Sequence, residues 1–238
     1  MKKLLLGIIA AVLWGAGGSW AGPQIAVPEG EFNFGKVPQS ATICHTYWLR
    51  STGDDTLRIT KIVPGCGCTK APVEDTVLAP GDSTRIDIFF DTQRYGGYVT
   101  KKPYVMTNAG EEPVFLTFHS HVLSVADSTL PIILTPNRLD VSQFTEMPRR
   151  KATFTIHNTS AKDYTLTVID CPADYFAVKL PPVVKAGETA EGSVEVLENR
   201  VGEEFERSLT FAISDEAGTR YTLPVKRMVR VKKGAVGS

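Results

Sequence analysis

The chain has 238 residues, of which 42% are hydrophobic, and its 26 basic and 26 acidic residues give a formal net charge of zero. This length suits two domains of roughly 100 to 120 residues, each with its own core. The sequence has no long basic run of the kind that neutralises phosphates, which argues against nucleic acid as a partner.

The first 21 residues have the pattern of a secretory signal peptide. Two lysines precede an apolar run from Leu4 to Trp14, and Ser19 and Ala21 supply the small residues of a cleavage site. The apolar run is shorter than the roughly 20 residues that a membrane span needs. We therefore expect cleavage after Ala21 and a periplasmic or secreted product that has no transmembrane segment.

From Gly22 onward, short runs of alternating apolar and polar residues are separated by turn residues, which predicts an all-β protein. Pro103 lacks a backbone donor, so we expect an edge position or a bulge there. Alternation in the second strand directs His45 and Tyr47 to the core and Cys44 outward. The strands expected in the first domain are Glu31–Val37, Ile43–Arg50, Leu57–Val63, Ser83–Asp91, Tyr98–Thr107 and Val114–Val122.

A similar series of strands follows, which indicates an internal repeat. Tyr47–Thr52 lines up with Phe154–Thr159, and Ala79–Ser83 lines up with Lys185–Thr189. The expected strands are Leu139–Phe144, Lys151–His157, Tyr164–Ile169, Thr189–Leu197, Glu204–Ser214 and Arg220–Val231. The pattern predicts two tandem immunoglobulin-like β-sandwich domains, residues 22–124 and 125–238, after the signal peptide.

One loop of the first domain departs from this ordinary β pattern. It reads Pro64-Gly65-Cys66-Gly67-Cys68-Thr69, and its glycines can adopt positive φ angles that other residues avoid. Such a loop can direct both sulfurs to one point. The second domain has Asp170-Cys171-Pro172-Ala173-Asp174 at the equivalent place, with one cysteine and no glycine.

Several motifs of the first domain, the cysteine loop above all, carry a resemblance to a known family. They are Phe32, Phe34-Gly35-x-Val37, His45-x-Tyr47, Ser51-Thr52-Gly53, Gly65-Cys66-Gly67-Cys68-Thr69, Ala79-Pro80-Gly81-Asp82 and Thr107-Asn108. Residues 30–122 resemble the exported bacterial domain-of-unknown-function family 1573, which is similar to immunoglobulin-like domains of ciliary and sperm-protein type. The resemblance implies a fold and a compartment but no established activity, and for the second domain it implies the fold alone.

A metal site is one use that the sequence suggests for the cysteines. In an immunoglobulin-like strand order, Cys66, Cys68, His45, His119 and His121 fall near one pole of the first domain. His119 and His121 leave the same face of a strand about 7 Å apart, and thiolates with imidazoles suit copper or zinc. Against this, His-x-His on a strand is ordinarily solvated surface, and Cys-x-Cys lacks the spacing of structural zinc knuckles.

Disulfide chemistry is the competing use of the same sulfurs, because exported compartments oxidise thiols. A Cys66–Cys68 bond would close a tight, strained and easily reduced ring, whereas Cys44 could reach the loop with ordinary geometry. If any bond forms, we expect it to join Cys44 with Cys66 or Cys68. Cys171 is interpreted as a buried, unreactive thiol. In a third, purely structural interpretation, the glycines shape a tight crossover and the thiols simply pack.

No enzyme is predicted, because the sequence has neither a Gly-x-Ser-x-Gly elbow nor a His-Glu-x-x-His motif. The leading hypothesis is a non-enzymatic exported module that binds a protein or cell-envelope partner. The alternative is a periplasmic copper- or zinc-binding or thiol-redox protein that uses Cys66 and Cys68. We also expect the cysteine loop near the domain junction, with the turns Asn158–Asp163 and Asp215–Gly218 facing the first domain.

Overall fold

The computed structural model describes residues 22–124 and 129–230, so the predicted signal peptide lies outside the described residues. These ranges consist of β-strands joined by loops and turns, with a short 3-10 turn at Glu198–Arg200, which confirms the all-β prediction. Within them, no helix has the length and apolar character that crossing a bilayer requires.

Two four-stranded sheets with the same strand order reveal the internal repeat. The first runs β1 (Ile25–Ala26), β3 (Thr42–Ser51), β7 (Ser83–Asp91), β5 (Thr69–Lys70), and the second runs β12 (Ile132–Thr135), β14 (Lys151–Asn158), β18 (Thr189–Val196), β16 (Phe176–Lys179). In both sheets, the two central strands form a long antiparallel ladder, and shorter strands flank this pair. We call the two copies the first and the second domain.

The facing sheet of the first domain bends where the sequence has Pro103. The predicted strand Tyr98–Thr107 divides there into β8 (Gly97–Lys101) and β9 (Tyr104–Thr107). β9 continues the sheet β10 (Gly110–Phe115), β9, β4 (Leu57–Val63), β6 (Val77–Leu78), whereas β8 pairs with β11 (Thr117–Leu123). The proline, which lacks an N–H, thus stands at a complete strand break instead of the expected edge position or bulge.

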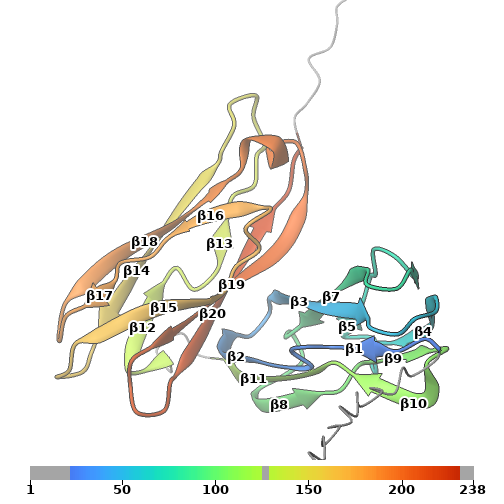
Figure 1. The fold of residues 1–238 in the computed structure, drawn as a ribbon. Coiled ribbons are helices and arrows are strands. Elements are labelled where there is room, and N and C mark those ends of the chain that lie inside the picture. The colour runs from blue at the N-terminus through green and yellow to red at the C-terminus, as the bar shows by residue number, and fades with distance from the viewer. Residues whose placement is uncertain (1–21, 125–128, 231–238) are drawn as a thin grey trace, which may run out of the picture.

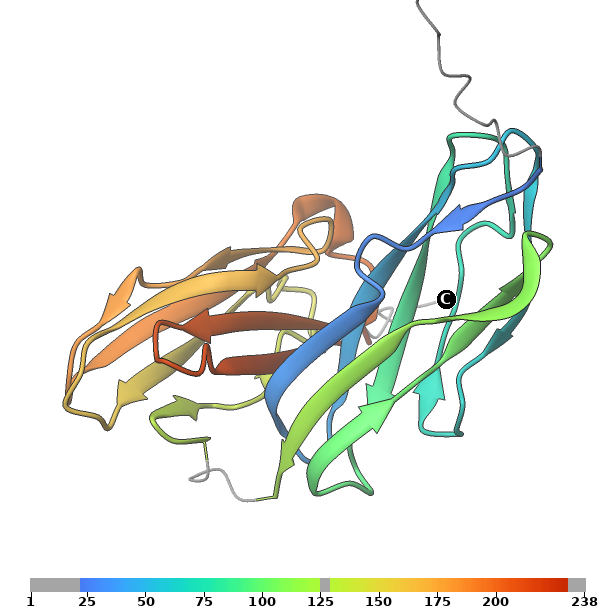
Figure 2. The ribbon, with the colours of Figure 1, turned by 60° about the horizontal axis from the view of Figure 1, so that its bottom comes forward.

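One sheet runs through both domains. Its order is β17 (Val183–Val184), β15 (Tyr164–Asp170), β19 (Phe205–Ile213), β20 (Arg220–Arg227), β2 (Glu31–Pro38), β11, β8, and β13 (Leu139–Asp140) also pairs with β20. β2 and β20 meet in parallel at Lys36 and Tyr221, and Figures 1 and 2 show these strands side by side between the domains. The domains therefore share backbone pairing as well as side-chain contacts.

Gly35 permits this close approach of β2 and β20. Its φ is +67°, and a Cβ atom at this position would lie 2.2 Å from the carbonyl oxygen of Arg220. The Thr222 hydroxyl donates to the Phe34 carbonyl at 2.6 Å beside it. A residue with a side chain would therefore meet both backbone strain and a collision.

The apolar side chains form two separate cores, one on each side of this shared strand pair. Phe34, Tyr47, Phe90 and Phe118 are buried in the first, and Phe154, Phe176, Phe211 and Tyr221 in the second. The larger part of each core comes from alternate residues of the long strands, as the period-two pattern predicts.

Candidate functional site at the cysteine loop and the domain junction

The loop between β4 and β5 contains a disulfide between Cys66 and Cys68. Gly65, with φ +85°, turns the chain out of β4. Two backbone bonds hold the rest: the Thr69 N–H donates to the Cys66 carbonyl at 3.2 Å, and the Asp91 N–H donates to the Cys68 carbonyl at 2.9 Å. The expected pairing of Cys44 with one of these cysteines is wrong.

Cys44 is a free thiol buried under the second domain. Its side chain leaves the outward face of β3, as alternation predicts, but β19 covers that face. The Cys44 N–H donates to the Ser208 hydroxyl at 2.9 Å, and Arg207 Nη1 lies 3.5 Å from the Cys44 sulfur. Burial raises the pKa of this thiol to about 12. A residue enclosed in this way cannot reach the loop.

The five predicted metal ligands do not come together. His45 points into the first domain, stacks on Phe32 with ring centroids 3.6 Å apart, and places Nδ1 2.6 Å from a carboxylate oxygen of Asp170. Because Cys66 and Cys68 are bonded to each other, neither offers a thiolate. In residues 22–124 and 129–230, no three His, Cys, Asp or Glu side chains are grouped to hold a metal ion.

The two remaining histidines lie on the outer face of β11, away from the core, and have partners of their own. His119 contacts the Thr100 hydroxyl at 2.8 Å and a carboxylate oxygen of Glu31 at 3.1 Å. His121 stacks on Tyr98 with ring centroids 4.1 Å apart. Burial and the nearby Lys36 ammonium lower the pKa of His121.

Polar groups surround the disulfide unequally. The Tyr95 hydroxyl donates to the Cys68 sulfur at 3.1 Å, and the Lys101 ammonium donates to the Tyr95 oxygen at 3.0 Å. Lys101 also lies over the Tyr95 ring, 4.5 Å from its centroid. The Thr69 hydroxyl is 3.3 Å from the Cys66 sulfur and 3.7 Å from the Cys68 sulfur. The two consecutive hydrogen bonds from the Lys101 ammonium through the Tyr95 hydroxyl therefore end at the Cys68 sulfur.

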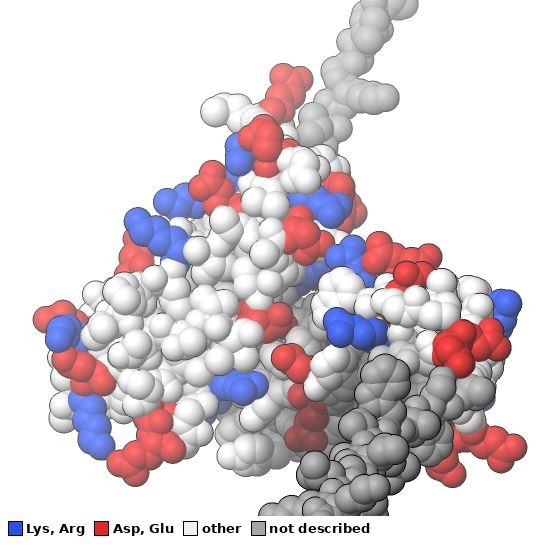
Figure 3. Space-filling model, in the orientation of Figure 1, with Lys and Arg blue, Asp and Glu red and all other residues white. Residues whose placement is uncertain are grey.

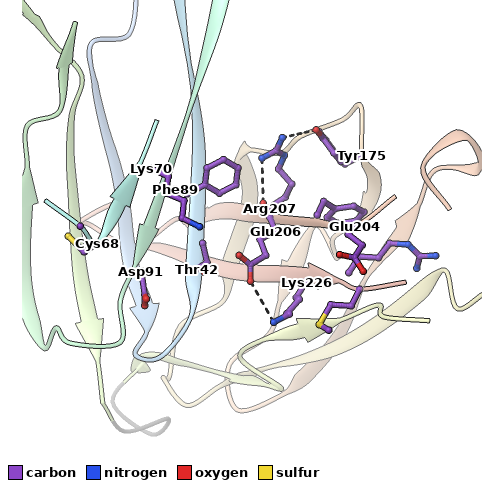
Figure 4. A pocket seen from close by; sticks show the side chains of 14 residues that line it. Thr42, Cys68, Lys70, Phe89, Asp91, Tyr175, Glu204, Glu206, Arg207 and Lys226 are labelled. Atoms are coloured by element: carbon purple, nitrogen blue, oxygen red, sulfur yellow. Dashed lines mark hydrogen bonds and ion pairs between the residues drawn. The ribbon is translucent and has the colours of Figure 1, made fainter. Parts of the chain in front are cut away.

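A cleft of about 600 Å³ separates the loop from the second domain. Gly67, Cys68 and Phe89 line it on one side, and Tyr175, Glu206, Arg207 and Lys226 line it on the other, as Figure 4 shows for the labelled side chains. The loop thus lies at the junction, as expected. The elements opposite it are the loop before β16, the start of β19 and the end of β20. Of the two turns expected to face the first domain, Asp215–Gly218 lies near Lys36 of β2, away from the loop.

Arg207 crosses the junction at the base of this cleft. Its Nη2 donates to a carboxylate oxygen of Asp87 at 2.8 Å and to the Tyr175 hydroxyl at 2.7 Å, and the residue is only 8% exposed. Sequence reasoning missed this group. The alternation of the strand does contain one indication of it. Arg207 falls on the same face of the strand as Phe205 and Leu209, which predicts that its charge faces inward and needs a partner.

A second contact links the loop Asp170–Asp174 to the first domain. Besides the bond between Asp170 and His45, a carboxylate oxygen of Asp174 accepts a hydrogen bond from Arg85 Nη1 at 3.0 Å. These carboxylates also escaped sequence reasoning, because acidic residues in a loop are ordinarily solvated and nothing local shows that another domain approaches.

Comparison with solved structures gives only distant likeness. A protein of unknown function from Porphyromonas gingivalis W83 is 10% identical, with 85% of this chain and 99% of that chain covered and a TM-score of 0.31. Domains 5–6 of the S-layer protein SbsC are 11% identical, with coverages of 87% and 99% and a TM-score of 0.29. The VesB protease of Vibrio cholerae is 9% identical over 42% of this chain, with a TM-score of 0.34, and the match spans about a third (31%) of its length.

No curated protein matches the sequence. A family model described as protein of unknown function (DUF1573) matches residues 25–122. This range contains the first core, the cysteine loop, and the strands β3 and β2 that meet the second domain. The match therefore falls on the first domain, which confirms the resemblance seen in its motifs.

Proposed function

We propose that this chain is a non-enzymatic, exported binding or assembly module of the bacterial cell envelope, and that its protein or envelope partner docks in the cleft between two immunoglobulin-like domains. The cleft itself carries the proposal. It measures about 600 Å³, and it combines the aromatic rings of Phe89 and Tyr175 with the charged groups of Glu206 and Lys226. Concave sites at domain interfaces that mix aromatic walls with a few polar groups are favoured for ligand binding.

The way the domains are joined supports this use of the cleft. Backbone pairing at Lys36 and Tyr221 and the bond of Arg207 to Asp87 hold the two walls at a fixed separation. A preformed site loses less conformational entropy when a partner binds than a site that must first assemble.

The surface charge favours recognition by local pattern. On the face shown in Figure 3, basic and acidic residues are interspersed over both domains. Such a surface gives little long-range steering toward a strongly charged polymer, so selectivity comes from the shape of the cleft and from single charged groups in its wall. Lys226 and Glu206 are such groups, and their Nζ and Oε1 atoms are 3.7 Å apart.

The test is capture of a partner from envelope extract by the mature protein and by two charge-reversal variants. Lys226→Glu changes the cleft wall, and Lys151→Glu makes the same change at an exposed residue of β14. We expect the wild type and Lys151→Glu to retain one specific partner that Lys226→Glu loses. Failure of the wild type to retain any specific partner, or equal retention by all three, would contradict docking in the cleft. Turnover of a small substrate would indicate an enzyme instead.

A further inference from the structure

The Cys66–Cys68 disulfide is exposed to an approaching thiol. A second cavity, of about 410 Å³, is lined by Cys66, Gly67 and Cys68 on one side and by Asp91, Gln93, Arg94 and Tyr95 on the other. Both cysteines are partly exposed, and the space where Gly67 would carry a Cβ atom is open. The disulfide can therefore be approached from this cavity, on the side of Gly67.

The two sulfurs differ in the charge that each could support. The Tyr95 hydroxyl donates to the Cys68 sulfur, and the Lys101 ammonium, by donating to the same hydroxyl, makes it a stronger donor. A thiolate at Cys68 would receive a charge-assisted hydrogen bond. Cys66 has only the Thr69 hydroxyl, at 3.3 Å. The better leaving group is the sulfur with the lower thiol pKa, so Cys68 is suited to leave and Cys66 to be attacked.

The other two cysteines cannot take part in this chemistry. Burial raises the thiol pKa of Cys44 to about 12 and that of Cys171 to about 11. At neutral pH both are protonated, and a protonated thiol is not a nucleophile. A reduced loop is therefore not re-bridged by another cysteine of the described chain.

We propose that the cysteine loop is a thiol–disulfide exchange site that accepts two electrons from a dithiol of another exported protein. A thiolate of that dithiol attacks the Cys66 sulfur, the bond between Cys66 and Cys68 breaks, and the electron pair leaves with the Cys68 thiolate. The second thiol of the partner, once deprotonated, attacks its own sulfur in the mixed disulfide and releases the Cys66 thiolate. The partner ends as a disulfide, and both loop cysteines end as thiols after taking up the two protons that the dithiol released.

The loop can be oxidised again by the reverse reaction with a partner that carries a more oxidising disulfide. This site goes beyond the binding function proposed above and does not depend on it, because a small thiol is enough to test the exchange. Its position in the wall of the cleft would bring it to a docked partner, since Cys68 and Gly67 line both cavities.

The experiment measures the rate at which glutathione and dithiothreitol reduce the folded full-length mature chain, with alkylation and mass spectrometry to locate the thiols. Cys66 and Cys68 should become alkylated together, while Cys44 and Cys171 stay unmodified. Tyr95→Phe removes only the hydroxyl next to Cys68, so it should slow reduction roughly tenfold. Tyr98→Phe is the matched control at an exposed tyrosine, and its rate should equal that of the wild type.

Two further variants separate exchange from a structural effect of Tyr95. Lys101→Met should also slow reduction, but by a smaller factor than Tyr95→Phe does. In Cys66→Ser, the remaining Cys68 thiol should titrate at a lower pH than in Cys66→Ser/Tyr95→Phe, as followed by thiolate absorbance. The proposal is overturned if the disulfide resists reduction until the protein unfolds, if Tyr95→Phe is reduced as fast as Tyr98→Phe, or if the Cys68 titration does not depend on Tyr95.

Discussion

The connection that follows β4 in the first domain and the one that follows β15 in the second occupy equivalent places in the repeat, but they differ in their residues and in what those residues contact. The first has glycines, a disulfide and two open cavities beside it. The second has Asp170 and Asp174, and both carboxylates bind side chains of the first domain, His45 and Arg85. One copy leaves this crossover free for chemistry, and the other uses it to fix the domain junction.

The difference shows how a duplicated fold can divide its tasks. Both crossovers lie where the chain passes from one sheet to the other. Glycines at this place give an exposed and adaptable loop. The carboxylates of Asp170 and Asp174 instead tie their loop to the first domain, through His45 and Arg85. We therefore expect changes on the second-domain side to alter the junction and changes in the cysteine loop to leave it intact.

Loss of Arg207 should have the largest effect. Arg207→Ala leaves the Asp87 carboxylate, whose side chain is 15% exposed, without its cation, and should lower the free energy of unfolding by about 3 to 5 kcal/mol. Chemical denaturation measures this loss. Arg150→Ala, which removes a more exposed arginine paired with Glu195 and Glu198, is the control and should cost about 1 kcal/mol or less. Equal losses in the two variants would show that the junction has no special contribution.

Gly35→Ala should disrupt the pairing of β2 with β20, which joins the two domains. The added methyl group would collide with the Arg220 carbonyl, and the positive φ adds strain, for a loss of about 2 to 4 kcal/mol. Gly187→Ala has a similar φ, +72°, and open space around the new atom, so it should cost only about 1 kcal/mol. Small-angle scattering of both variants would show whether the domains move apart in the first alone; unchanged scattering with equal stabilities would contradict this account of the shared sheet.

Replacing both loop cysteines should have a smaller effect. The chain-entropy estimate for a disulfide that closes so short a loop is roughly 1.5 kcal/mol, so Cys66→Ser/Cys68→Ser should lose about that much stability. Its scattering curve should match that of the wild type, because the junction is made by other residues. A changed curve would mean that the disulfide also positions the second domain, and the contrast between the two crossovers would fail.

The last effect is absent at neutral pH and is a pH dependence from Cys44. Its thiol pKa is raised from 9.0 to about 12 by burial, so folding favours the protonated form. This contribution is fully present below about pH 9 and is lost as the pH rises toward 12. Above about pH 9 the free energy of unfolding should fall by up to about 1.4 kcal/mol per pH unit more in the wild type than in Cys44→Ala. Parallel curves for the two proteins would exclude the thiol as the cause.

The sequence predicts the regular part of this fold well, because alternation needs no knowledge of distant partners. The strands Leu57–Val63 and Ser83–Asp91 agree with β4 and β7 residue for residue. Strands of two residues, such as β1, β5 and β6, escape prediction because two residues show no period. Their existence depends on tertiary contacts alone.

The candidate site is predicted less completely, for a different physical reason. The sequence identifies Cys66 and Cys68, but local spacing does not decide which sulfurs meet. Cys44 lies on the face that alternation assigns to it, and only the approach of β19 turns that face into a buried one. The bonds of Arg207 and Asp170 likewise depend on how two domains dock, which no period within either domain encodes.

The parallel pairing of β2 with β20 has a consequence for how the protein is made. Most of the described chain separates Lys36 from Tyr221, so the joint cannot form until both domains have been synthesised. Until then, the edge of β2 offers unpaired backbone groups to any other extended chain. Contacts this distant in sequence form slowly, which lengthens the exposure. The first domain can therefore fold at a stage when the edge of β2 is still open to self-association.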